Sequence, residues 1–154
     1  MAMINVEVQR TIHRPVAVVS RQFVDIQHHS QNRVHPNIRF TVLAEEGDTC
    51  TFRQEVKLVG MLQTDEIVQH RNADGSLSWD VVEGANKGTH IYQGFTPVGA
   101  EATLVTFRAE APATGIKRLL KPLFAIAIRK AVAKGLEEDR LDLEERGYGK
   151  VGQT

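Results

Sequence analysis

Residues 116–146 have the sequence IKRLLKPLFAIAIRKAVAKGLEEDRLDLEER. In the first half of this segment apolar side chains recur at helical spacing, at Ile116, Leu120, Phe124, Ala127 and Ala131. In the second half the apolar stripe moves to another side, so the middle of the segment is apolar nearly all round. We therefore predict one long helix of roughly 45 Å, long enough to cross a small domain. Its apolar middle is expected to be both core and the wall of a pocket.

The ends of this helix are marked by residues that favour helix boundaries. Thr114 is the expected N-cap, and Gly147 is placed to end the helix. Pro122 is expected to kink the helix or to shift its start, because proline cannot donate the intrahelical hydrogen bond. The charges oppose the helix dipole, with bases such as Lys117 early and acids such as Glu138 late. They form either a solvated face or a basic rim that attracts an anionic ligand or a membrane surface.

Bulk composition describes an ordinary soluble protein. With 154 residues the chain is expected to form one domain over 1–154, in which 148–154 is a loose tail. A formal net charge of zero argues against nucleic acid as a partner. Cys50 is the single cysteine, which excludes an internal disulfide and multi-cysteine metal sites. The sequence shows no signal peptide and no apolar run of about 20 residues, so we expect a cytoplasmic protein without a transmembrane segment.

Strand patterns fill most of the chain before residue 116. The segment Ile4–Ile12 alternates as a strand, and Pro15 begins the first of two short helices. Six further strands follow, joined by short turns: Ile38–Ala44, Thr49–Leu58, Met61–His70, Ser76–Glu83, Thr89–Thr96 and Ala102–Ala111. Such connections predict an antiparallel meander. The expected fold is therefore α+β, a curved seven-stranded antiparallel sheet wrapped around the long C-terminal helix.

One face of this predicted sheet is apolar but is interrupted by polar residues. Counting alternate positions places Gln54, Thr64, Glu66 and Gln93 on the face that meets the helix. A buried amide or carboxylate without a partner costs roughly 1–3 kcal/mol or more. These residues therefore indicate an enclosed, partly polar cavity, unless strand bulges turn them outward.

The order of these elements resembles the START-like, Bet v 1-like helix-grip superfamily, also called SRPBCC. Within it the chain is most similar to the polyketide cyclase/dehydrase and lipid-transport branch. The similarity covers nearly the whole chain, and the segments that carry it are Val6–Pro15, Phe23–Ile26, His35-Pro36, Lys121–Leu123 and Leu136-Glu137. It implies a deep, largely apolar cavity between sheet and helix that holds lipids, hormones, quinones or polyketides. No cyclase acid–base pair of the family can be matched residue by residue.

Histidines near the two short helices are the most unusual local feature. His28 and His29 point about 100° apart on a helix, whereas His29 and His35 can converge if the chain bends at 32–34. A metal would need a third ligand, for which Glu66 and Asp25 are the candidates. We expect no metal and no cofactor, and we expect His29 and His35 either at the cavity mouth or on the surface.

The site residues follow from these patterns. Glu66 is the candidate acid–base group, because an apolar wall would raise the pKa of its carboxyl. The expected ligand-binding residues lie on the inner face, on the histidine segment and on the helix: His29, His35, Phe52, Gln54, Glu66, Trp79, Gln93, Leu120 and Phe124. Cys50 is expected to be a buried, inert thiol.

Three functions fit the sequence. The first is binding or transport of a small hydrophobic ligand such as a lipid, quinone or polyketide-like molecule. The second is a cyclase/dehydratase-type lyase or isomerase that uses Glu66. The third is an interaction module that forms a homodimer through the apolar middle of the helix, around Ile128.

Overall fold

The computed structural model describes residues 2–58 and 60–149, which form seven strands and four helices. In chain order these are β1 (Met3–Ile12), α1 (Val16–Val24), α2 (Ile26–Gln31), β2 (Ile38–Glu46), β3 (Thr49–Leu58), β4 (Met61–Arg71), β5 (Leu77–Gly84), β6 (His90–Pro97), β7 (Thr103–Pro112), α3 (Ile116–Leu119) and α4 (Lys121–Glu144).

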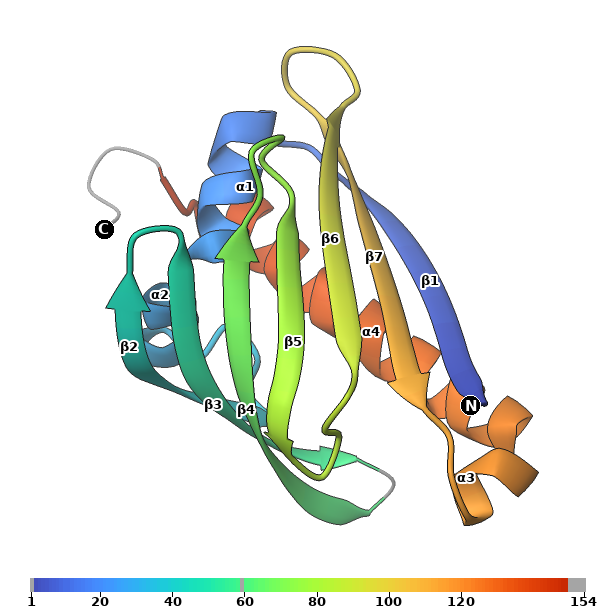
Figure 1. Ribbon diagram of the computed structural model, residues 1–154. Coiled ribbons are helices and arrows are strands. Elements are labelled where there is room, and N and C mark those ends of the chain that lie inside the picture. Colours follow the sequence, from blue (N-terminus) through green and yellow to red (C-terminus); the bar gives the residue numbers. More distant parts are fainter. Residues whose placement is uncertain (1, 59, 150–154) are drawn as a thin grey trace.

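The strands form one antiparallel sheet in the order β1-β7-β6-β5-β4-β3-β2. Consecutive strands from β2 to β7 pair with their neighbours, and β1 pairs along its whole length with β7. The sheet curves, α4 crosses one face of it, and α1 and α2 lie toward the C-terminal end of α4 (Figure 1). The predicted helix-grip fold is confirmed.

The C-terminal helical segment is divided in two. Four-residue α3 ends at Leu119, and α4 begins at Lys121 with Pro122 in its first turn, where a missing N–H is tolerated. The predicted effect of Pro122 is thus confirmed. The predicted cap at Thr114 is wrong, because Gly115 takes the N-cap position at φ 57°, a conformation that favours glycine. The last helix ends at Glu144 rather than Arg146, and Gly147 follows at φ 74°.

The inner face of the sheet follows the predicted alternation on β2, β3, β5, β6 and β7 but not on β4. Phe52 pairs with Ile67 and Gln54 with Asp65, so odd-numbered residues of β4 face inward. Leu58 of β3 pairs with Met61 of β4, so residue i lies opposite residue i+3 where the chain passes between these strands. Inward positions therefore change from even to odd numbers between the two strands. Thr64 and Glu66 leave the inner face, and Asp65 and Gln69 take their places.

Phe52 and Cys50 belong to a buried cluster between the sheet and α2. Phe52 is fully buried, and its ring meets those of Phe40 and Trp79 edge to face at 5.7 Å and 5.1 Å between centroids. Cys50 is also buried. Burial, and secondly the charge of Glu45, raise the pKa of the Cys50 thiol to about 11.

At pH 8 we expect Cys50 to react with a disulfide reagent about 100-fold more slowly in the folded protein than in the urea-unfolded chain. The thiolate is the reactive form, and near pH 8 a thiol with so high a pKa is almost wholly protonated as well as shielded. The measurement is the rate of thiol labelling from pH 7 to 10, with the urea-unfolded chain as control. Fast labelling of the folded protein at pH 8 would contradict the buried position.

Candidate functional site

A cavity of about 220 Å³ lies between the inner face of the sheet and α4. Its wall is mainly apolar, with side chains from α1, α2, β2 to β7 and α4. Representative wall residues are Ile38, Phe40, Ile67, Val81, Ile91 and Phe107. The volume lies below the roughly 300–1,000 Å³ of sites for drug-sized ligands. The preformed space therefore suits a small molecule or one end of a longer one.

Polar groups face this apolar space at several points. Gln54 and Gln93 line the cavity, as does Thr89 just before β6. The Gln93 amide nitrogen Nε2 and the Thr89 hydroxyl Oγ1 are buried and have no hydrogen-bond partner among residues 2–58 and 60–149. Buried polar groups are nearly always paired, so unpaired donors on residues that line a cavity indicate places where a water molecule, an ion or a ligand completes the hydrogen bonding.

The structure brings five of the predicted ligand-binding residues together around the cavity and leaves four elsewhere. His29, His35, Gln54, Trp79 and Gln93 line it. The others do not: Phe52 lies in the core against Trp79, Leu120 is exposed at the junction of α3 and α4, Phe124 packs against a buried cluster of Ile4, Val6 and Ala113, and Glu66 lies off the inner face. Phe52 and Phe124 could not be separated from wall residues by periodicity, because core and wall share one face.

Asp65 occupies the inward position that Glu66 was expected to take. One oxygen, Oδ1, accepts the backbone N–H of Asn86 at 2.7 Å, and Oδ2 accepts the Asn86 side-chain amide at 2.7 Å. These bonds hold the loop between β5 and β6 against β4. Asp65 is therefore a clamp for a loop that contributes Asn86 and Thr89 to the cavity wall, rather than a free base.

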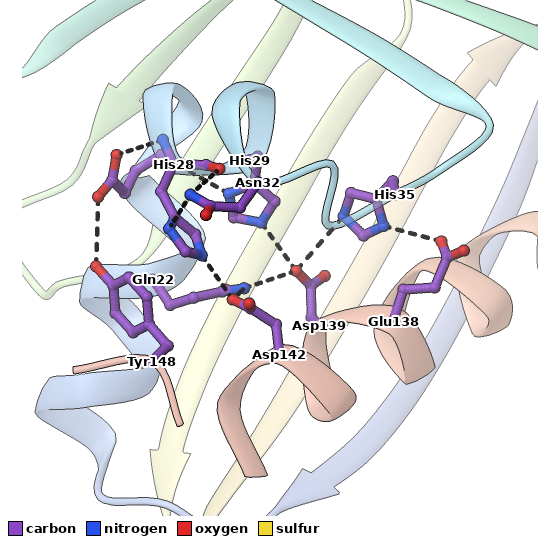
Figure 2. Close-up of polar contacts among 10 residues, drawn as sticks. Gln22, His28, His29, Asn32, His35, Glu138, Asp139, Asp142 and Tyr148 are labelled. Carbon is purple, nitrogen blue, oxygen red and sulfur yellow. Dashed lines mark hydrogen bonds and ion pairs between the residues drawn. The ribbon is translucent and has the colours of Figure 1, made fainter. Parts of the chain in front are cut away.

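At the other end of the cavity, α2 is joined to α4 by a buried polar network (Figure 2). His28 Nε2 lies 2.8 Å from Asp142 Oδ2, and His29 Nε2 lies 2.8 Å from Asp139 Oδ1. Gln22 of α1 donates its amide hydrogens to both carboxylates, at 2.9 Å and 3.1 Å.

The network is extended on both sides. His35 Nδ1 lies 2.9 Å from Glu138 Oε1, and Asp25 caps α2 through the backbone N–H of His28. The hydroxyl of Tyr148 donates to Asp25 at 3.3 Å, so this residue of the predicted loose tail is anchored. Residues 150–154 of that predicted tail lie outside the described residues.

The predicted convergence of His29 and His35 is confirmed. Arg33 has φ 49°, a left-handed conformation that turns the chain between them, and the two rings lie stacked with 5.4 Å between centroids. The group that completes the cluster is Asp139, not Glu66 or Asp25. One ligand atom from each of His29, His35 and Asp139 lies within 4.8 Å of the others, and all three residues are buried.

Asp139 and Asp142 were missed from the sequence, although a signal was present. Asp139 lies three residues after Leu136 and four before Leu143, on the helix face that both buried leucines share. An acid in the middle of an apolar stripe predicts a buried partner. The late acids of α4 were expected to be a solvated face. In the structure Asp139 and Asp142 instead hold α2, and Glu138 holds the segment after α2 through His35.

Charge in the network shifts two of its pKa values. Burial alone would lower the pKa of His35, but the charge of Asp139 and hydrogen bonds to Asp139 and Glu138 raise it to about 9. Burial alone would raise the pKa of Asp139, but the charge of His35 and hydrogen bonds from both histidines hold it well below its usual range. The cluster therefore favours a cation beside an ionised carboxylate.

The sequence matches a family model described as polyketide cyclase/dehydrase and lipid transport over residues 3–141. The chain belongs to this family. No curated protein matches it closely enough to be counted as a relative. For this member of the polyketide cyclase/dehydrase and lipid-transport family, no helix within residues 2–58 and 60–149 is long and apolar enough to cross a membrane.

Solved structures share the fold of this family member at low sequence identity. The protein TTHA0849 from Thermus thermophilus has a TM-score of 0.79 and 22% identity, with 92% of this chain and 99% of that chain covered. The ZhuI aromatase/cyclase from a Streptomyces species has a TM-score of 0.77 and 17% identity, with 95% and 99% covered. A START superfamily protein from Mycobacterium smegmatis has a TM-score of 0.69 and 17% identity, with 92% and 95% covered.

Proposed function

We propose that this protein binds a small, mostly apolar ligand that carries a hydrogen-bond acceptor, in the cavity between the sheet and α4. The observation that carries the proposal is the side-chain amide of Gln93, a residue that lines the apolar cavity and whose buried donor Nε2 has no partner among the described residues. The apolar wall supplies affinity through burial, and a few polar groups fix orientation. Membership in a family that includes lipid-transport proteins supports the same proposal.

Glu66 does not support the cyclase alternative in the form expected from the sequence. The register of β4 places Glu66 away from the inner face, and the neighbouring Asp65 already accepts two hydrogen bonds from Asn86. In the dimer alternative, Ile128 is not available for the expected contact, because it lines the cavity and packs against Ile4 and Val6 of β1. Leu123 and Ile126 of the same apolar middle are exposed. A homodimer formed through the helix stays a prediction.

Trp79 makes ligand binding directly measurable. It is the only tryptophan in the sequence and lies in the cavity wall, so its fluorescence reports what enters. The experiment is a titration with octan-2-one and, separately, octane, which differ in one carbonyl acceptor and absorb little where tryptophan is excited. We expect both to bind, with the ketone tighter.

Two alanines of α4 give matched variants for this titration. Ala131 is exposed and lines the cavity, whereas Ala133 is exposed but does not. We expect Ala131→Phe to weaken binding at least tenfold, roughly, by filling space that the ligand needs, and Ala133→Phe to leave it unchanged. Failure of both molecules to bind, or equal effects of the two variants, would overturn the proposed site.

Gln93→Leu is expected to raise the stability of the ligand-free protein by about 1 kcal/mol while weakening ketone binding about fivefold. Leucine has a similar volume and removes an unpaired buried donor, and a typical net hydrogen bond contributes about 1 kcal/mol. Urea unfolding measures the first effect and the Trp79 titration the second. Octane affinity, which depends on no acceptor, is the control and should not fall. A less stable variant that still prefers the ketone would show that Gln93 is structural.

A further inference from the structure

Three ligand atoms from separate segments converge on one point of the cavity wall. They are His29 Nε2 from α2, His35 Nε2 from the segment after it, and Asp139 Oδ1 from α4 (Figure 2). The Asp139 oxygen lies 2.8 Å from the first nitrogen and 3.4 Å from the second. All three residues line the cavity, so the point at which they meet opens to it.

The second nitrogen of each ring fixes which atom carries the hydrogen. His29 Nδ1 lies 2.8 Å from the backbone oxygen of Asp25, which can only accept. His35 Nδ1 lies 2.9 Å from the carboxylate of Glu138, which likewise accepts. Each Nδ1 must therefore donate, and in a neutral imidazole the Nε2 atom then presents a lone pair. Both lone pairs point at Asp139 Oδ1, which is itself an acceptor.

Lone pairs cannot meet in this way unless a cation lies between them. One solution is a proton on each Nε2, which places two imidazolium rings stacked against each other in a buried site. The other is a single divalent ion that accepts all three lone pairs at once. Hydrogen bonds from Nδ1 to a carbonyl and to a carboxylate are the contacts that orient histidines around protein-bound metals.

We propose that His29 Nε2, His35 Nε2 and Asp139 Oδ1 form a binding site for one divalent first-row transition ion of the Zn²⁺ or Fe²⁺ class. Two imidazoles with one carboxylate suit these ions, and three protein ligands leave at least one coordination position open. That position faces the cavity, where a donor atom of water or of a bound ligand can complete the shell. The site is independent of the proposed ligand, because the metal alone can be titrated.

The distances are compatible with this assignment. Metal–ligand bonds of about 2.0–2.2 Å in tetrahedral geometry set ligand atoms roughly 3.3 Å apart. The 3.4 Å between His35 Nε2 and Asp139 Oδ1 already meets this value, and the 2.8 Å to His29 Nε2 must open slightly. Gln22 donates to Asp139 Oδ1 and would further orient the carboxylate.

The test is a titration of the chelator-treated full-length protein with Zn²⁺ by calorimetry, repeated with Co²⁺ to record visible absorption. We expect one ion per chain, ligand-field bands of four- or five-coordinate cobalt, and displacement of cobalt by zinc. NMR of the histidine rings should show the Nε2 resonances of His29 and His35 moving while that of His90, which is paired with Asp80 on β5, stays in place.

Variants separate a metal site from a structural network. His35→Ala and Asp139→Asn should each weaken binding at least about 100-fold, and Glu138→Gln, which changes only the partner of His35 Nδ1, about tenfold. His28→Gln alters the same network at Asp142, away from the three ligand atoms, and should change the affinity for the metal by less than about threefold. Circular dichroism confirms that each variant is folded. No binding to the folded wild type, or binding that survives both His35→Ala and Asp139→Asn, overturns the proposal and leaves a protonated network.

Discussion

Replacing Asp139 with alanine is expected to lower the free energy of unfolding of the metal-free protein by about 3–5 kcal/mol, as when one partner of a buried charge pair is removed. Asp139 is 5% exposed, accepts from Gln22, and lies 2.8 Å and 3.4 Å from the Nε2 atoms of His29 and His35. Without it the amide loses an acceptor, and in the metal-free protein the protonated imidazole rings lose their buried counter-charge. The contact between α2 and α4, which closes one end of the cavity, depends on this carboxylate.

Urea unfolding in the presence of a chelator measures this loss, and the chelator removes any contribution of metal. Glu137→Ala is the matched control on the same helix, because Glu137 pairs with Arg10 and Arg140 at the surface and should matter far less. If the two substitutions cost the same, the buried network is not what holds α2 to α4.

The fold could be predicted from the sequence because its turns and helix boundaries are each determined by a few neighbouring residues. Short turns at 47–48 and 72–76 require antiparallel neighbours, and Pro122 must lie in the first turn of a helix or kink it. These rules do not depend on what packs against the segment. The seven strands and the C-terminal helix were therefore predictable in number, order and approximate bounds.

Glu66 shows where such reasoning stops for the site. The alternation within β4 was visible, but which set of residues faces inward depends on the register in which β4 pairs with β3. A shift by one residue places Asp65 instead of Glu66 on the inner face. The inward carboxylate is then the one that holds the Asn86 loop, and not the expected acid–base group. The pairing of Leu58 with Met61, separated by two residues, is the local feature that sets the inward face of β4.

The cluster of His29, His35 and Asp139 shows a different limit. His29 and His35 were recognised as a pair, yet their partner lies more than a hundred residues later, on α4. Helical periodicity gives the face on which Asp139 lies but not what that face meets. Long-range pairing of this kind is decided by the packing of α2 against α4, which no local pattern encodes.

Gly84→Ala is expected to destabilise the protein by about 3 kcal/mol, as backbone strain of about 1–2 kcal/mol adds to the cost of overpacking. Gly84 has φ 114°, and a Cβ at this position would overlap the backbone oxygen of Thr64. The added carbon would also come within 2.7 Å of Asp65 Oδ1, the atom that accepts the Asn86 backbone N–H. The substitution should therefore loosen the loop that carries Asn86 and Thr89 as well as lowering overall stability.

Gly75→Ala is the control that separates backbone strain from steric overlap at Gly84. Gly75 has a similar positive φ of 88° in the turn before β5, but a Cβ there meets nothing within 4 Å. We expect Gly75→Ala to lower the free energy of unfolding by only the backbone strain of about 1–2 kcal/mol. The remaining difference between the two variants, about 1–2 kcal/mol, then belongs to the close approach of β4 and β5. Urea unfolding of both variants gives this difference, and Trp79 titration shows whether only Gly84→Ala weakens ligand binding. Equal losses in the two variants would mean that the strands can separate at Gly84, and that the Asp65 clamp contributes little to the shape of the cavity.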